Sequence, residues 1–546
     1  MISKKLLIIL IAVLTVIALA IIGWSIYKKH YLRSKVKDVV ADGSRGLYSI
    51  AFGKLDLDEV NGDLTVTDLR LRPDTIRYNE LAQTEEVPPI VAHLEIPSLK
   101  VVGVKTPKAL LNKEIEGRKV LIENPQIVLF FTNRGKDSLR RVPDKELYEQ
   151  LLGNLSKIGI DTVSIVNATV ITRNLNDGRK LMQFDSVRID LFKVAVDSIH
   201  GKDTTRLLFA EYASMLCKKI SWKDKRGLYE FIVSDVDFNS RGQRMAISRI
   251  GVNPLLPEAT FLQQFKYATD RFDIELKDVR MVNLNVASLM KQSIAADSMI
   301  VGNSRFRIYR DISYPHDGRD RTSYLPHQQL MELPVPLSIK EVVFPSGFIE
   351  YKERNSKSEQ SGKVQFHQVS VRISNLTNDT TILKENGICK LRFHSRFLNR
   401  APIDATIQFY PLDEKGKFTI EGTLGSMPAT AVNQLSVPMG LAKIEKGSIR
   451  KLSFSLSGND YRADGPVTIL YHDLGVSLLK KDEEDKSLDK KKLASLMARI
   501  MIKKANPGKN DEVRTAHVHF ERDIHRSFFH LVWKSIFAGV KESVGM

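Results

Sequence analysis

Apolar and polar residues alternate in short runs from about residue 45 onward. The clearest run is Leu452–Ser457, and Val467–Ile469 repeats the pattern a few residues later. Because successive side chains of a strand point to opposite faces, each run places its apolar side chains on one face of a sheet. Turn signals such as Asn61-Gly62 and Lys415-Gly416 separate the runs. The sequence therefore predicts a mostly β fold, built from many short antiparallel strands.

The order of apolar positions repeats at an offset of about 180 residues. The aligned positions include Leu47-Tyr48 with Leu228-Tyr229, Asn124 with Asn303, and Phe184 with Phe366. Since the offset persists through three blocks, it predicts an internal duplication. We expect a first β block over residues 31–225 and a second over 226–390, followed by a C-terminal module over 391–546. Repetition of β units favours an elongated, curved sheet over a globule.

One apolar segment near the N-terminus is long enough to cross a membrane. Leu6–Trp24 holds nineteen residues without a charge, and at about 1.5 Å per residue a helix of this length spans roughly 28 Å. A cleavable signal peptide is the alternative, but the apolar run continues past Ala18–Ala20. We expect an uncleaved single-pass anchor within residues 1–30. Lysines flank both ends, so charge alone does not fix the side on which the body lies.

The net charge of the chain is +18, and much of it lies near the two ends. Residues 1–40 carry +6 and residues 476–546 carry +5, which leaves +7 for the 435 residues between them. No nucleic-acid-reading module accompanies this mild excess, so we expect no nucleic-acid partner. Weak attraction to an anionic membrane surface fits the distribution better.

Enzyme signatures are absent from the sequence. No phosphate-binding, dinucleotide-binding, nucleophile-elbow or zinc-protease motif occurs, so we expect no enzyme activity and no cofactor. The two cysteines, Cys217 and Cys389, are far apart and form no redox motif. Two buried free thiols are the expectation, and one disulfide in an oxidising compartment is the alternative.

A cluster of histidines near the C-terminus is the strongest candidate for a metal or catalytic site. His517 and His519 would share one face of a strand, and His525 and His530 follow. No carboxylate is placed near them by a recognised pattern. Solvent-facing histidines at a strand-to-helix junction are the expectation, and a metal site or a hydrolase using His517 and His519 is the alternative.

Helical periodicity is confined to a few segments. Short helices are expected over Asp144–Leu152 and Thr260–Ala268, and an apolar stripe over Leu493–Met501 predicts another. Phe529–Val540 predicts the last helix, with one wide apolar face. We expect the two C-terminal helices to close the end of the protein's own core, with membrane contact as the alternative.

The C-terminal third resembles a known family. The stretches Gly422–Asp482 and Asn506–Gly545 are similar to the C-terminal module of the AsmA-like family of bacterial envelope proteins, which belongs with the TamB-type and bridge-like lipid transfer proteins. In that module a residue like Asn433 follows a short helix, and a strand like Ile444–Ile449 comes next. The anchor matches weakly, and the middle of the chain matches in style only.

The resemblance implies a bacterial inner-membrane protein whose body lies in the periplasm. It implies a curved β groove that binds or transfers lipid, with phospholipid as the expected partner, in envelope or outer-membrane biogenesis. Leu452, Phe454 and Leu456 are the candidate lipid-facing residues, since their alternation with serine supplies an apolar face. The alternative function is a non-enzymatic scaffold that holds envelope protein partners through its sheet edges.

Overall fold

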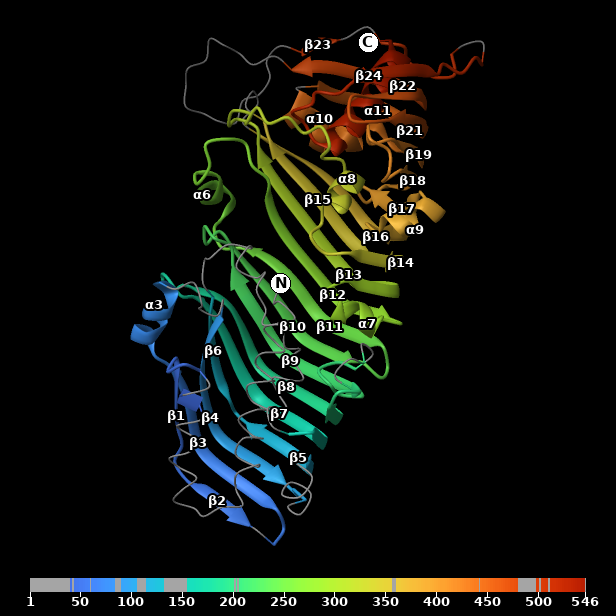
Figure 1. The fold of residues 1–546 in the computed structure, drawn as a ribbon. Coiled ribbons are helices and arrows are strands. Elements are labelled where there is room, and N and C mark those ends of the chain that lie inside the picture. Colours follow the sequence, from blue (N-terminus) through green and yellow to red (C-terminus); the bar gives the residue numbers. More distant parts are fainter. Residues whose placement is uncertain are drawn as a thin grey trace. The chain divides into compact units, whose positions relative to one another are not determined.

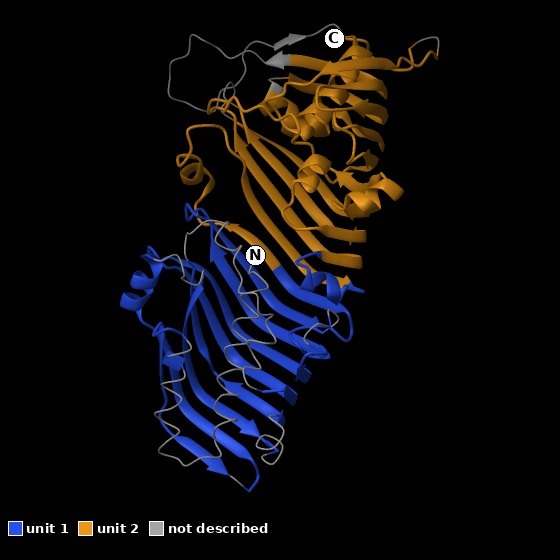
Figure 2. Cartoon of the chain, viewed as in Figure 1, with its two compact units in different colours: residues 1–249, 282–293 blue, residues 250–281, 294–546 orange. Residues whose placement is uncertain are grey.

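The computed structural model of the chain is mostly β, as the alternation predicts. It describes residues 40–41, 44–58, 60–83, 90–105, 114–131, 155–200, 203, 206–355, 360–440, 442–479, 497–499, 502–508 and 511–545. The chain forms two compact units, coloured separately in Figure 2. Unit 1 contains residues 1–249 and 282–293, and unit 2 contains residues 250–281 and 294–546. The block boundaries at 225 and 390 remain a prediction.

Unit 1 is built around a sheet whose strands mostly follow the chain order, except that two short strands share one edge of β3 and two more lie end to end between β4 and β7 (Figure 1). Its elements are β1 (Tyr48–Ala51), β2 (Leu55–Asp58), β3 (Asp63–Pro73), α3 (Thr75–Gln83), β4 (Ile90–Val102), β5 (Glu114–Glu123), β6 (Gln126–Phe131), β7 (Lys157–Asn174), β8 (Lys180–Val196), β9 (Tyr212–Lys223), β10 (Tyr229–Asn239), the start of β11 (Arg244–Pro254), and α7 (Val286–Met290). Thirty buried apolar residues from β1 to β10 and the segment before β9 form one continuous core cluster.

Unit 2 continues the same kind of strand order and carries more helices (Figure 1). Its elements are α6 (Glu258–Leu262), most of β12 (Arg271–Val282), β13 (Ile294–Asp311), α8 (Pro326–Met331), β14 (Leu337–Phe344), β15 (Gly347–Arg354), β16 (Ser361–Thr377), α9 (Thr380–Glu385), β17 (Cys389–Phe397), β18 (Ala401–Phe409), β19 (Phe418–Leu424), β20 (Met427–Pro428), the 3-10 turn Ala429–Val432, α10 (Asn433–Gly440), β21 (Ala442–Gly458), β22 (Arg462–Leu479), β23 (Met497–Arg499), β24 (Ala516–Glu521) and α11 (Phe528–Val544).

The predicted duplication appears in the strand boundaries and in the pairing register. The span from the start of β5 to the end of β6 covers residues 114–131, and β13 covers residues 294–311, 180 residues later. Residue Glu114 pairs with Lys157 of β7, and Ile294 pairs with Leu337 of β14, so each pair is 43 residues apart. Both pairings are parallel. The expectation of a wholly antiparallel sheet is therefore wrong at these two junctions, because the chain returns to the same end of the sheet before each new strand.

A residue with positive φ reverses the side-chain alternation at several points in the described strands. Asp68, Ser186, Asp235, Asp278 and Gln368 have φ between 49° and 53° and lie in β3, β8, β10, β12 and β16. Each is the fifth residue of an eight-residue pattern whose first, third, sixth and eighth positions are apolar, as in Leu64–Leu71 and Ile274–Met281. We name this pattern the reversal motif.

The reversal motif keeps one face of a long strand apolar on both sides of a bend. In a regular strand, residues three apart face opposite sides of the sheet. Val66 and Leu69 flank Asp68 at this spacing, yet both are fully buried in the same core cluster. The left-handed residue acts as a bulge that shifts the alternation by one position.

The helix predictions have mixed outcomes. The last helix is confirmed as α11. The helix expected over Thr260–Ala268 is right only at Thr260–Leu262, because α6 covers Glu258–Leu262 and the chain turns after Leu262. The helix expected over Leu493–Met501 is wrong at Met497–Arg499. These residues form β23, because their backbone groups find hydrogen-bond partners along the edge of β22. Asp144–Leu152 and the expected anchor at residues 6–24 lie outside the described residues. Within the described ranges, no helix has the length and hydropathy needed to span a bilayer.

Candidate functional site

Leu452, Phe454 and Leu456 pack into the core of unit 2. Phe454 and Leu456 are buried, and Leu452 is half-buried against the same residues. Leu531 of α11 belongs to this core cluster, so the protein's own helix covers the face to which the three residues belong. The structure thus gives them a packing role, and we place the candidate lipid-contacting surface elsewhere.

The apolar face of unit 1 is less covered toward β9 and β10. Most core-facing apolar residues of β3 to β6 are buried, Val170, Met182 and Phe184 of β7 and β8 are half-buried, and so are five residues of β9 and β10. We name these five the apolar strip: Met215, Ile220, Trp222, Phe231 and Val233. The reversal motif around Asp235 keeps both ends of β10 facing the same side of the sheet.

Strand pairing brings the apolar strip together. Trp222 lies opposite Phe231, and Ile220 lies opposite Val233. The rings of Trp222 and Phe231 stack with centroids 5.0 Å apart and an interplanar angle of 7°. Leu216 is 48% exposed and occupies the opposite face of β9, since it lies between the buried Cys217 and the half-buried Met215. The strip therefore offers a preformed apolar surface with aromatic side chains at one end.

A depression of about 680 Å³ lies on the polar face of the sheet in unit 2. Register places Ser370, His394 and Asp404 of β16, β17 and β18 side by side in it. His394 Nδ1 lies 2.7 Å from Asp404, but both side chains are more than half exposed, and the structure contains no hydrogen bond between His394 and Ser370. The row therefore lacks the contact between nucleophile and base, and the burial, that are typical of a preorganised catalytic centre.

The C-terminal histidines do not converge on one site. His517 and His519 are exposed on β24, and His519 pairs with Asp464. His525 Nδ1 lies 3.0 Å from the Arg319 carbonyl oxygen, and burial lowers the pKa of His530 to about 4. In the part of the chain that the structure describes, no three His, Cys, Asp or Glu residues are grouped closely enough to hold a metal ion. Cys217 and Cys389 are buried free thiols, as expected, and burial raises the pKa of each to about 11.

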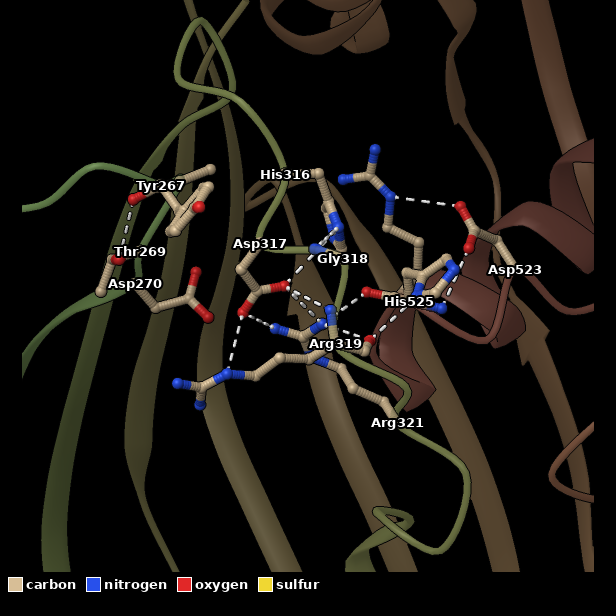
Figure 3. Close-up of polar contacts among 12 residues, drawn as sticks. Tyr267, Thr269, Asp270, His316, Asp317, Gly318, Arg319, Arg321, Asp523 and His525 are labelled. Carbon is tan, nitrogen blue, oxygen red and sulfur yellow. Dashed lines mark hydrogen bonds and ion pairs between the residues drawn. The ribbon is translucent and has the colours of Figure 1, made fainter.

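The connection between β13 and β14 docks onto the turn before α11 through a polar cluster (Figure 3). Arg321 donates from both terminal nitrogens to the Asp317 carboxylate at 3.0 and 2.9 Å, and its backbone N–H donates to the Ile524 carbonyl. Beneath it, the fully buried Arg522 donates to Asp460 at 3.1 Å. Sequence reasoning missed this cluster, because its partners lie about 200 residues apart. The pairing fixes the connection and gives no open position for a substrate.

Two asparagine side chains, in the segments 422–482 and 506–545, form hydrogen bonds to backbone groups and so have a structural rather than a ligand-binding role. The Asn433 side chain donates to the Ile444 carbonyl and accepts from the Ile444 N–H. Buried Asn506 donates to the carbonyls of Ile469 and Arg514 and accepts from the Arg514 N–H. Each side-chain amide therefore joins its own segment to a second segment, with the same pair of donor and acceptor that a backbone peptide group supplies between strands.

No family model matches the chain, and no curated protein matches its sequence.

Proposed function

We propose that this protein binds lipid acyl chains along the apolar strip and acts as a non-enzymatic lipid-handling protein. The observation that carries the proposal is the half-buried strip on β9 and β10, whose paired and stacked apolar side chains continue the buried core of β3 to β8. Each acyl CH₂ buried against such a surface contributes about 0.8 kcal/mol, so a few methylenes offset the cost of ordering the chain.

The proposal includes the cellular setting that the sequence predicts. The segment at residues 6–24 would anchor the chain in a bacterial inner membrane, with the body in the periplasm and phospholipid as the ligand. Its role would then be lipid transfer or lipid retention in envelope and outer-membrane biogenesis. The family resemblance of residues 422–482 and 506–545 supports this setting.

The test is lipid extraction and native mass spectrometry on the full chain purified from its own membrane. The variant Trp222→Asp/Phe231→Asp places two charges in the strip, and Leu216→Asp places one on the opposite face of β9 as a control. We expect stoichiometric phospholipid with the unmodified chain and with Leu216→Asp, and at least tenfold less with the strip variant. Circular dichroism checks that all three chains fold.

Equal lipid in all three chains would mean that only the anchor retains it, and the proposal would fail. A lipid-free chain that instead copurifies with a stoichiometric protein partner would favour the scaffold function. Loss of function on replacing His517 and His519 with Ala in a folded chain would favour a hydrolase.

A further inference from the structure

The outward face of α11 carries three large aromatic side chains. Phe529, Trp533 and Phe537 are spaced four residues apart and are 73%, 43% and 41% exposed. Side chains at this spacing lie next to one another along a helix. We name the three residues the aromatic stripe.

The aromatic stripe lies outside the core cluster beneath the helix, and only the Phe529 ring contacts it, through the buried Phe528. The buried face of α11 contains Phe528 and Leu531 at its start, then the small residues Ser535, Gly539 and Ser543. A Cβ on Gly539 would lie 2.5 Å from the Val467 Cβ, so the helix backbone sits directly on β22. α11 is therefore apolar on both sides, whereas a helix that only closes a core is polar on its outer side.

Cationic side chains accompany the stripe. Lys534 and Lys541 are exposed on α11, and the Lys541 ammonium lies 4.9 Å from the centroid of the Phe537 ring. Exposed Lys503 adds a charge at the C-terminal end of the helix, where its backbone N–H donates to the Val544 carbonyl. Glu542 is the acidic residue of α11. Large apolar rings flanked by lysines are typical of helices that lie in a membrane interface.

We propose that the aromatic stripe of α11 docks onto the surface of an anionic lipid membrane. Phe529, Trp533 and Phe537 insert at the boundary between headgroups and acyl chains, and Lys534 and Lys541 face the lipid phosphates. The helix is preformed because Gly539 fixes it to the sheet, so docking requires no folding step. The inference goes beyond the proposed function and holds whether or not the apolar strip binds lipid.

Tryptophan fluorescence quenching in vesicles tests the docking with the full chain. The chain has three tryptophans, so Trp24→Phe/Trp222→Phe leaves Trp533 as the sole emitter. This chain is reconstituted into vesicles of phosphatidylcholine, alone or with phosphatidylglycerol, in which a share of the acyl chains is brominated. We expect brominated lipid to quench Trp533 strongly in the anionic vesicles and weakly in the neutral ones.

Two variants and one control make the test specific. Lys534→Glu/Lys541→Glu should lower the ratio of docked to undocked helix at least roughly 30-fold, because each lysine near an anionic surface favours binding by about fivefold and the two factors multiply. Phe529→Ser/Phe537→Ser should abolish quenching. Leu412→Ser, which alters a 44% exposed side chain in the turn between β18 and β19, should leave quenching unchanged.

Three outcomes would overturn the inference. Trp533 that brominated lipid never quenches would exclude membrane contact. Equal quenching in neutral and anionic vesicles would exclude the role of the lysines. Emission that is already blue-shifted and insensitive to lipid in the chain alone would show that protein, including a second copy of this chain, covers the stripe. None of these readouts depends on lipid in the apolar strip.

Discussion

At the scale of single residues, the left-handed positions decide which face of each strand is apolar. Asp68, Ser186, Asp235, Asp278 and Gln368 are all polar, and polar residues with short side chains tolerate positive φ better than β-branched ones. Asp278 is exposed on β12 with φ of 53°. The positive φ at position 278, rather than a contact of its side chain, therefore limits which amino acids this position accepts.

Asp278→Val should lower the free energy of unfolding by about 1–2 kcal/mol, because a β-branched residue resists positive φ. Asp278→Gly should be neutral or slightly stabilising, since glycine adopts this conformation without strain. Chemical denaturation followed by far-ultraviolet circular dichroism measures both. Equal stability of the two variants would show that β12 relaxes without the left-handed residue.

The Asp317 carboxylate should contribute to stability in a defined pH range. Its hydrogen bonds from Arg321 are the largest cause of a pKa lowered from 3.8 to about 2. A carboxylate with a lowered folded-state pKa stabilises the fold above its unfolded pKa, and this stabilisation is lost as pH falls from about 4 to about 2. Asp317→Asn should therefore cost about 1–2 kcal/mol at pH 6 and almost nothing at pH 2. Denaturation curves at both pH values test this, and a difference that is constant with pH would contradict it.

At the scale of elements, α11 is held by close backbone packing. Alanine is a better helix former than glycine by about 1 kcal/mol, so Gly539→Ala would stabilise a free helix. Its Cβ, however, would lie 2.5 Å from the Val467 Cβ and close to Val518.

We expect Gly539→Ala to destabilise unit 2 by about 1–3 kcal/mol, because overpacking outweighs helix propensity. Hydrogen exchange of residues 528–544 should become faster as the helix lifts from β22 and β24. Glu542→Ala, on the exposed side of the same helix, serves as the control. Slower exchange in Gly539→Ala would show that the helix moves outward without cost.

The sequence predicted which strands and helices form better than it predicted what these elements pack against. Alternation found the strands, and apolar periodicity found α11, because both patterns are local. The roles of Leu452, Phe454 and Leu456 could not be predicted, since their burial depends on α11, which follows about 70 residues later. Similarly, β23 forms because β22 offers an edge. The reversal motif was present in the sequence as apolar spacings of two, three and two, and a search for that spacing would have found it.

At the scale of the whole molecule, each unit has a core of its own. One cluster of thirty buried residues belongs to unit 1, and the cluster around Phe418 and Leu531 belongs to unit 2. Substitutions in one cluster should therefore act mainly on that unit.

Val66→Ala removes two methyl groups from a fully buried site in unit 1 and should cost about 1–3 kcal/mol there. Hydrogen exchange should become faster in β3 to β8, while protection of β19, β21 and α11 stays unchanged. A uniform loss of protection across both units would show that they unfold as one cooperative body.

The parallel junction in unit 2 also bears on where substitutions are tolerated. Its paired residues Ile294 and Leu337 are 43 positions apart, and about 25 of these positions form the return segment between Asp311 and Leu337. The ladder between β13 and β14 depends on the strands, so the sequence of the return segment can vary while the framework persists. In this protein that segment carries the polar cluster that joins the turn before α11.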